Sequence, residues 1–207
     1  MKVIAIDTWN RKEHYEFFNT FSDPYFAVTS KVDVTVAKQY AKKNELSFFG
    51  VYLHACMQAI NSVENFKYRI EDDKVVRYDV IHASATMIRP NQTFGFTFVN
   101  YNEDLNSFIK NVQLEKERIL NSNTLFPPTN TLDCIYCSAM PWVDFTGHKE
   151  PVSGQKESVP KLAFGKVTEV NDKLEMSVAV SVNHALVDGY HVGQFLENFQ
   201  EFLNSYK

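Results

Sequence analysis

Residues 182–191 read Val182-Asn183-His184-Ala185-Leu186-Val187-Asp188-Gly189-Tyr190-His191. The residues before His184 alternate between apolar and small or polar side chains, which predicts a strand over 173–183 with one buried face. Asp188-Gly189 is typical of a tight turn, and the sequence after it predicts a helix over 190–205. The segment therefore places His184 at the end of a strand, beside a turn that leads directly into a helix.

This position suits a group that transfers protons. A histidine between a strand end and a turn is held rigidly by its neighbours, and a proton-transfer group needs a fixed position. Its unperturbed pKa of about 6.5 lets an imidazole accept a proton at neutral pH. His184 is therefore a candidate general base. A hydrogen-bonded structural histidine is the alternative, and the residues alone leave both interpretations open.

The rest of the chain predicts strands interspersed with helices. We expect strands at 3–6, 25–34, 68–70, 75–78, 82–88, 93–99, 133–138 and 161–169. We expect helices at 11–20, 34–44, 47–62 and 103–120, and a loop at 121–130, which contains two prolines. This order predicts an α/β fold, a two-layer sandwich in which a mixed β-sheet carries helices on one face. No linker or repeat divides the chain, so residues 1–207 are expected to form a single domain.

The composition is that of a folded protein and excludes several kinds of partner. Hydrophobic residues make up 44% of the 207 residues, and the net charge of -4 comes without any basic run, so we expect no nucleic-acid partner. No apolar run approaches the roughly 18 residues that a membrane-spanning helix needs. An odd number of cysteines, three, and the lack of a signal peptide predict a cytoplasmic protein.

Cys134 and Cys137 have the spacing of a redox or zinc pair. Residues three apart in a strand point to opposite faces, so these two sulfur atoms should diverge. No second pair completes a zinc site, and the histidines show no ligand spacing. We therefore expect no bound metal.

Three segments of the chain resemble the chloramphenicol acetyltransferase family of CoA-dependent acyltransferases. The first is Trp9-Asn10-Arg11-Lys12-Glu13-His14-Tyr15, and the second is Ser138-Ala139-Met140-Pro141-Trp142-Val143. The third begins at His184 and contains the pattern His-x-x-x-Asp-Gly. The segments follow one another in the family's order and at similar distances, and the similarity runs almost from end to end.

The resemblance implies a chloramphenicol acetyltransferase-like fold and a cytoplasmic homotrimer with active sites at its subunit interfaces. It implies acetyl-CoA as co-substrate and a small molecule with a hydroxyl group as acceptor. The expected activity is chloramphenicol O-acetylation, the basis of resistance to this antibiotic. His184 would deprotonate the acceptor hydroxyl for direct attack on the thioester, and Ser138 would donate a hydrogen bond to the resulting oxyanion.

The resemblance also implies supporting and binding residues. Asp188 and Arg11 would form a structural pair that fixes the turn of His184, and Trp142 and Lys166 would contact CoA. The residues expected to line the acceptor pocket are mostly aromatic: Phe17, Phe18, Phe94, Phe96, Phe126 and His148.

The chain departs from the family pattern at several positions. Asn183 replaces a second histidine, and Ala163 stands where the family has a threonine that helps to hold a water at the transition state. Residues 147–150, Gly-His-Lys-Glu, replace apolar residues of the acceptor pocket. Phe96 falls where the family tends to be small, which would narrow that pocket. An acyltransferase of the same fold that acts on a more polar hydroxyl or amine acceptor is therefore the alternative function.

Other functions share the motif or the trimer. The catalytic domain of a dihydrolipoamide acyltransferase would be expected to follow a lipoyl domain and flexible linkers, which this sequence does not contain. A condensation domain of peptide synthesis needs about twice this length, because it is built from two such units. A binding trimer without enzyme activity would require His184 and Ser138 to be incidental.

Overall fold

The computed structural model describes all residues 1–207 and is organised around a six-stranded sheet in the order β2-β9-β8-β7-β5-β6. Its strands are β2 (Tyr25–Asp33), β5 (His82–Ile88), β6 (Phe94–Phe96), β7 (Cys134–Ala139), β8 (Lys161–Val170) and β9 (Lys173–Asn183). The pairs β5–β7 and β7–β8 are parallel and the other pairs are antiparallel. This mixed sheet confirms the predicted fold class.

A second, small sheet lies beside the first. It contains β1 (Lys2–Val3), β4 (Lys74–Arg77) and β3 (Tyr68–Glu71), all antiparallel. The β3–β4 hairpin turns at Asp72 and Asp73, which both have positive φ. Asp is one of the few non-glycine residues that adopt this conformation readily, so the acidic turn fits its place.

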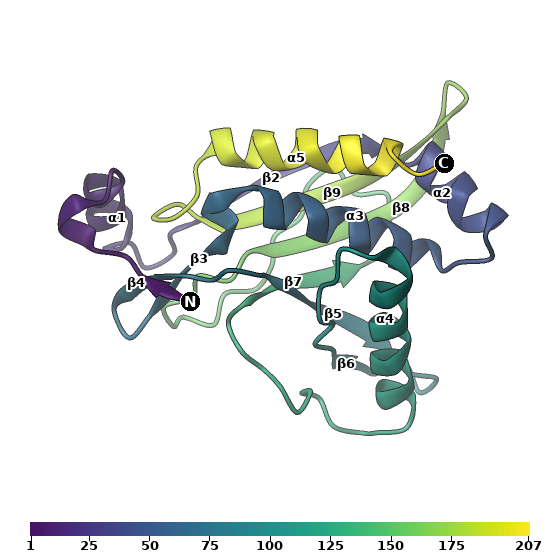
Figure 1. The fold of residues 1–207 in the computed structure, drawn as a ribbon, viewed down its shortest axis with the longest axis horizontal. Helices are drawn as coiled ribbons and strands as arrows, with labels where there is room; N and C mark the ends of the chain where they lie inside the picture. The colour runs from purple at the N-terminus through teal and green to yellow at the C-terminus, as the bar shows by residue number, and fades with distance from the viewer.

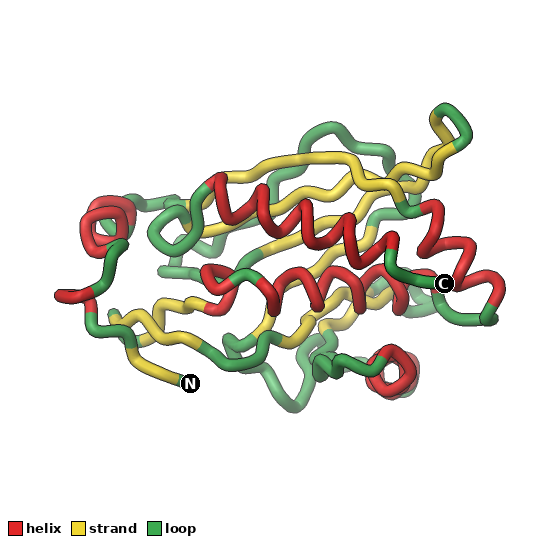
Figure 2. The backbone as a smooth tube through the Cα atoms, turned by 45° about the horizontal axis from the view of Figure 1, so that its top comes forward, coloured by secondary structure: helices red, strands yellow, loops and turns green.

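The helices cover one face of the large sheet. α3 (Phe48–Ser62) and α5 (Gly189–Asn204) lie side by side over the sheet and run roughly along its strands, and α2 (Thr35–Lys43) lies near one end of them (Figures 1 and 2). α3 is apolar almost all round and is buried over most of its length, as the sequence predicts. α1 (Lys12–Phe18) and α4 (Leu105–Leu120) lie at opposite ends of the molecule (Figure 1).

The two faces of the sheet differ because side chains alternate along a strand. One face, with Val178, Val180 and Leu162, joins the main core of 37 buried residues under the helices. The other face carries small side chains, and Ala163 and Ala179 pack there with Phe145 in a separate cluster. Phe145 belongs to a loop segment, residues 141–160, that crosses this face. The Ser177 hydroxyl donates to the carbonyl oxygen of Phe145, 2.6 Å away, which fixes the segment there.

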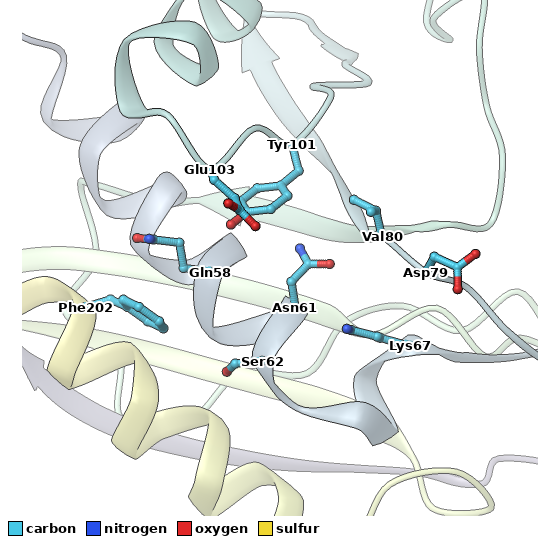
Figure 3. A pocket seen from close by; sticks show the side chains of 9 residues that line it. All are labelled: Gln58, Asn61, Ser62, Lys67, Asp79, Val80, Tyr101, Glu103 and Phe202. Atoms are coloured by element: carbon cyan, nitrogen blue, oxygen red, sulfur yellow. The ribbon is translucent and has the colours of Figure 1, made fainter.

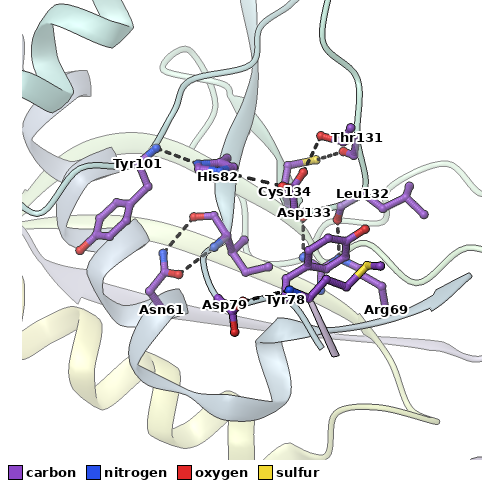
Figure 4. Close-up of polar contacts among 12 residues, drawn as sticks. Asn61, Arg69, Tyr78, Asp79, His82, Tyr101, Thr131, Leu132, Asp133 and Cys134 are labelled. Carbon is purple, nitrogen blue, oxygen red and sulfur yellow. Dashed lines mark hydrogen bonds and ion pairs between the residues drawn. The ribbon is translucent and has the colours of Figure 1, made fainter. Parts of the chain in front are cut away.

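A fully buried arginine joins the small sheet to the large one. Arg69 in β3 has no carboxylate partner. Its guanidinium donates instead to four carbonyl oxygens at 2.6–2.8 Å, those of Phe66 and Tyr68 and, as Figure 4 shows, those of Leu132 and Cys134. Burial lowers its pKa to about 10, so the side chain stays charged at neutral pH. Four carbonyl dipoles replace the water that a buried cation loses.

The predicted elements match the structure except near some ends. The expected strand at 3–6 is wrong in part, because β1 ends at Val3 and Ile6–Thr8 form a 3-10 helix. The strand expected at 93–99 is reduced to β6, after which Val99 makes only an isolated bridge to Ala83. Cys134 and Cys137 pack in different clusters, as the alternation along a strand predicts. No helix combines the length and the apolar character that crossing a membrane requires.

Candidate functional site

The backbone around His184 is fixed by hydrogen bonds on both sides. The His184 amide donates to the carbonyl oxygen of Pro24 at 2.9 Å. The side chain of Asn183 accepts from the Ala185 amide at 2.9 Å and donates to the carbonyl oxygen of Glu157 at 2.8 Å. The end of β9 is thereby tied to the start of β2 and to the segment that crosses the outer face of the sheet.

The turn after His184 is closed by a capping box. Asp188 is the N-cap residue of α5, and its side chain accepts from the backbone of His191, while the Asp188 amide donates to Nδ1 of His191 at 3.0 Å. These bonds satisfy backbone donors at the start of the helix. His191, which the sequence places at the first turn of the helix, is therefore a capping residue.

The His184 ring lies between two aromatic side chains. The Phe18 ring stacks on it with a centroid distance of 4.0 Å and an interplanar angle of 5°, and Phe26 contacts it at 4.6 Å. Nδ1 is buried and lies 3.2 Å from Oδ1 of Asp188, but their orientation does not make a hydrogen bond. Because 34% of the side chain is exposed, Nε2 is the ring nitrogen available to another molecule.

Arg11 joins the N-terminal segment to this turn. Its guanidinium makes a bidentate ion pair with the Asp188 carboxylate, with Nη1 on Oδ2 and Nη2 2.9 Å from Oδ1, and Nη2 also donates to the carbonyl oxygen of His184 at 3.2 Å. The Arg11 side chain is only 9% exposed. Its charge and hydrogen bonds lower the pKa of Asp188 below the usual value. The structure thus brings together three of the predicted residues, Arg11, His184 and Asp188.

Ser138 lies elsewhere, at the wall of a cavity of about 590 Å³ between α4 and the segment 138–150. Most of the lining is apolar and comes from β5, α4 and the residues after β7. Three other predicted residues line the same cavity: Phe94, Trp142 and His148. Trp142 is 68% exposed, so its side chain borders solvent at this lining.

Strand register gives the separation of Ser138 from His184. Ser138 pairs with Ala163 across β7–β8, and Ala163 pairs with Ala179 across β8–β9. His184 follows Ala179 by five residues, so two strand spacings and five residues of rise place the two side chains roughly 20 Å apart. The cavity lies beside α4, whereas the His184 turn lies towards the α1 end (Figure 1). One chain cannot bring both groups to the same reacting atom.

The other predicted residues divide between these two ends. Phe17 is 60% exposed and packs edge-on against Phe18, beside His184. The Phe96 ring stacks on the Phe126 ring with a centroid distance of 5.5 Å and packs edge-on against the Phe94 ring with a centroid distance of 5.4 Å, near the cavity. Both ends therefore expose aromatic side chains to solvent within a single chain.

Two further predicted positions lie close to Ser138 along the sheet. Lys166 is exposed in β8, and its amide donates to the carbonyl oxygen of Val143 at 2.8 Å. Ala163, the register partner of Ser138, is fully buried and offers no hydroxyl. Thr86 follows the Ala85–Cys137 pair of β5 and β7 and lines the cavity, so its hydroxyl lies beside Ser138.

Several contacts of this site could not be expected from the motifs in the sequence. Phe26, Asn183 and Thr86 had no assigned place in it, although alternation along β2 and β5 could have located Phe26 and Thr86. The link from Asn183 to Glu157 joins a strand end to an irregular segment, and no local pattern in the sequence encodes such a link.

A second cavity, a polar groove of about 380 Å³, lies between α3, α5 and residues 79–103 (Figure 3). Four of its nine lining residues carry amide or carboxylate side chains: Gln58, Asn61, Asp79 and Glu103. None of the predicted site residues lines it. The chemistry that the sequence predicts therefore belongs to the His184 and Ser138 ends of the chain.

Comparisons with known proteins show which family the whole chain is similar to. The family model described as "Chloramphenicol acetyltransferase" matches residues 1–200. Chloramphenicol acetyltransferase 3 of Escherichia coli is 30% identical over 206 residues, covering 97% of this chain and 95% of that protein. Chloramphenicol acetyltransferase 2 of Haemophilus influenzae is 25% identical, with 95% and 94% of the two chains covered.

Solved structures show the same similarity in three dimensions. A structure named chloramphenicol acetyltransferase superposes with a TM-score of 0.86 at 30% identity, over 98% of this chain and 99% of that one. A probable dihydrolipoamide acetyltransferase from Listeria monocytogenes gives a TM-score of 0.68 at 12% identity, over 100% and 96% of the two chains. At that identity the second similarity concerns the fold alone.

Proposed function

This chain belongs to the chloramphenicol acetyltransferase family and is an acyltransferase of that type, and from this premise we propose that it transfers the acetyl group of acetyl-CoA to a hydroxyl of a small-molecule acceptor. Chloramphenicol is the first acceptor to test, because several of the most similar relatives carry its name. We propose that residues 1–207 act as one catalytic domain. The observation that carries the proposal is the position of His184, whose ring is clamped between aromatic side chains with Nε2 open to a ligand.

His184 acts as the general base in this proposal. A proton on Nδ1, 3.2 Å from the Asp188 carboxylate, leaves Nε2 free to accept the proton of the acceptor hydroxyl. The oxygen attacks the thioester carbonyl carbon, and the resulting oxyanion accepts a hydrogen bond from Ser138. When the C–S bond breaks, the imidazolium returns its proton to the CoA sulfur. The products are the acetyl ester and CoA, and the enzyme is regenerated.

The partners of this reaction come from two subunits. Because His184 and Ser138 of one chain lie roughly 20 Å apart, we propose that His184 of one subunit acts at the cavity of its neighbour in a homotrimer. The exposed aromatic residues at the two ends support this arrangement, since exposed apolar side chains that gather on a surface mark interaction sites: Phe17 lies beside His184, and Phe94 and Phe126 lie near the cavity. Trp142 and Lys166, both exposed and joined through the segment after β7, are the proposed CoA contacts.

A second candidate function is transfer to a more polar acceptor. The specific observation in its favour is a contact of 3.0 Å between His148 and Glu150 inside the cavity lining. A carboxylate in such a place disfavours a purely apolar ligand.

The proposed function is tested by measuring thiol release from acetyl-CoA with chloramphenicol and a panel of other alcohols, alongside the His184→Ala variant. We expect acceptor-dependent release that falls at least about a thousandfold in the variant, since the general base and the activated attack are lost together. Release that the variant retains in full would refute the assignment of His184. Sedimentation velocity on the same preparation reports the oligomeric state.

A further inference from the structure

The cavity beside Ser138 is lined by a single carboxylate, that of Glu150. Of the twenty side chains that line it, only Lys116, His148 and Glu150 are ionisable under ordinary conditions. Lys116 is exposed on α4, so water screens its charge. Glu150 is only 17% exposed, so water screens its charge less than that of Lys116.

Glu150 has more hydrogen-bonding capacity than the protein uses. Its side chain makes one hydrogen bond, between Oε1 and Nε2 of His148 at 3.0 Å. Oε2 contacts no donor of the chain and is not sealed off from the cavity. A carboxylate accepts up to about four hydrogen bonds, so most of this capacity faces the space that the acceptor would fill.

An apolar ligand in this cavity would displace water from Glu150 without replacing its hydrogen bonds, which costs free energy. A ligand with a positively charged donor would instead form a charge-assisted hydrogen bond in a partly dehydrated site, where such bonds are strongest. A site built around a polar group discriminates strongly against ligands that leave it unpaired.

We propose that Glu150 is the specificity-determining residue of the acceptor site and selects small alcohols that carry a protonated amine. This inference rests on the proposed function, because it takes the cavity beside Ser138 as the acceptor site. His148 positions the carboxylate through its hydrogen bond with Oε1. The Glu150 Oε2 atom then receives the ammonium group, and the apolar walls from α4 and β5 hold the rest of the molecule.

Two ligands that differ only at the relevant group provide the test. Chloramphenicol carries a neutral dichloroacetamide, and chloramphenicol amine has a free ammonium on the same nitrophenyl propanediol. Binding of each is measured at neutral pH by isothermal titration calorimetry, with the wild-type protein and with Glu150→Gln, which keeps the shape and removes the charge. Glu117→Gln is the matched control, the same substitution at an exposed carboxylate of α4 outside the cavity.

We expect Glu150→Gln to weaken binding of the amine by about tenfold or more, the loss of one charge-assisted hydrogen bond, and to change binding of chloramphenicol by less than about twofold. Glu117→Gln should change neither. Equal changes for both ligands, or no change for the amine, would overturn the proposal. Binding does not require turnover, so the two proposals can fail separately. If the cavity binds the amine through Glu150 but the protein transfers no acetyl group, only the proposed function is refuted. If the protein transfers acetyl groups but Glu150→Gln does not selectively weaken binding of the amine, only the role of Glu150 is refuted.

Discussion

Phe18 and His184 stack with their ring planes 5° apart and their centroids 4.0 Å apart. Phe18 lies near the end of α1 and His184 at the end of β9, so the stack connects the N-terminal segment to the C-terminal part of the sheet. It restricts rotation of the imidazole about its side-chain bonds, which hydrogen bonds to the backbone alone cannot do. The orientation of Nε2 therefore depends on an aromatic contact.

The first prediction concerns this contact. Phe18→Ala should lower kcat by about tenfold to a hundredfold, because a small displacement of a catalytic group has effects of this size. Stability should fall little, since Phe18 is only half-buried. Steady-state kinetics and a thermal melt check the two expectations, with Phe18→Tyr as the control that retains the stack. A loss of activity in the Tyr variant equal to that in the Ala variant would argue against stacking as the cause.

The second prediction concerns the pair of Arg11 and Asp188. Removing one partner of a buried, hydrogen-bonded pair leaves the other charge uncompensated, so Arg11→Ala should cost on the order of 2–3 kcal/mol of unfolding free energy. Activity should fall as well, because Arg11 also binds the carbonyl oxygen of His184. Arg11→Lys keeps the charge but not the bidentate geometry and should show a smaller effect on both. Urea denaturation and kcat are measured on the same preparations. Loss of activity without loss of stability would contradict the structural assignment of this pair.

The third prediction is a pH dependence with a definite sign. Arg11 lowers the folded-state pKa of Asp188 below its ordinary value of 3.8. Because the pKa of Asp188 is lower in the folded than in the unfolded protein, the ion pair contributes its full stabilisation at any pH above the unfolded-state pKa. This contribution is lost as the pH falls through the folded-state pKa. The stability difference between wild type and Asp188→Asn should therefore be constant near neutral pH and shrink below about pH 4. Urea denaturation at a series of pH values checks this, and a difference that grows on acidification would show the opposite linkage.

The fourth prediction concerns Gly95 in β6, next to Phe94 of the cavity lining. A Cβ atom on Gly95 would lie 2.5 Å from Cδ1 of Ile119 and 2.6 Å from Nη2 of Arg89. Arg89 is itself held by carbonyl oxygens at the end of α4, in the loop after it and at Phe94 of β6. Gly95→Ala should therefore destabilise the protein by about 1–3 kcal/mol through overpacking.

The control is Gly193→Ala on α5, where a Cβ atom would meet nothing within 4 Å. This variant should stabilise the protein by about 0.5–1 kcal/mol. Thermal melts that move in the same direction for both variants would refute the steric account.

The regular part of this fold was predictable from local patterns. β9 follows its alternating residues from Lys173 to Asn183, and α4 follows its apolar spacing to Leu120. Ile6–Thr8 were not predictable in this way, because a single 3-10 turn is too short to show a period. The position of His184 came from the strand and the turn that flank it.

The contacts of the candidate site were less predictable. The pairing of Arg11 with Asp188 spans 177 residues and followed only from the resemblance to a family. The contact of His148 with Glu150 depends on the conformation of a segment without regular structure. No periodicity encodes such contacts, since they arise from how distant parts of the chain meet.

The last prediction follows from the separation of His184 and Ser138 within one chain. If each active site combines His184 of one subunit with Ser138 of the next, two inactive variants should complement each other. His184→Ala should be almost inactive, and Ser138→Ala should lose about a hundredfold to a thousandfold in kcat, as removal of one oxyanion donor does.

When equal amounts of the two are unfolded together and refolded, an intact site forms wherever a Ser138→Ala subunit supplies His184 to a His184→Ala neighbour. Random assembly into a closed ring gives this arrangement at about one site in four, so activity should recover to about a quarter of the wild-type value. Refolding each variant alone is the control. A mixture no more active than its separate components would mean that each site is built within one chain, which the strand register does not permit, or that the two residues do not act together.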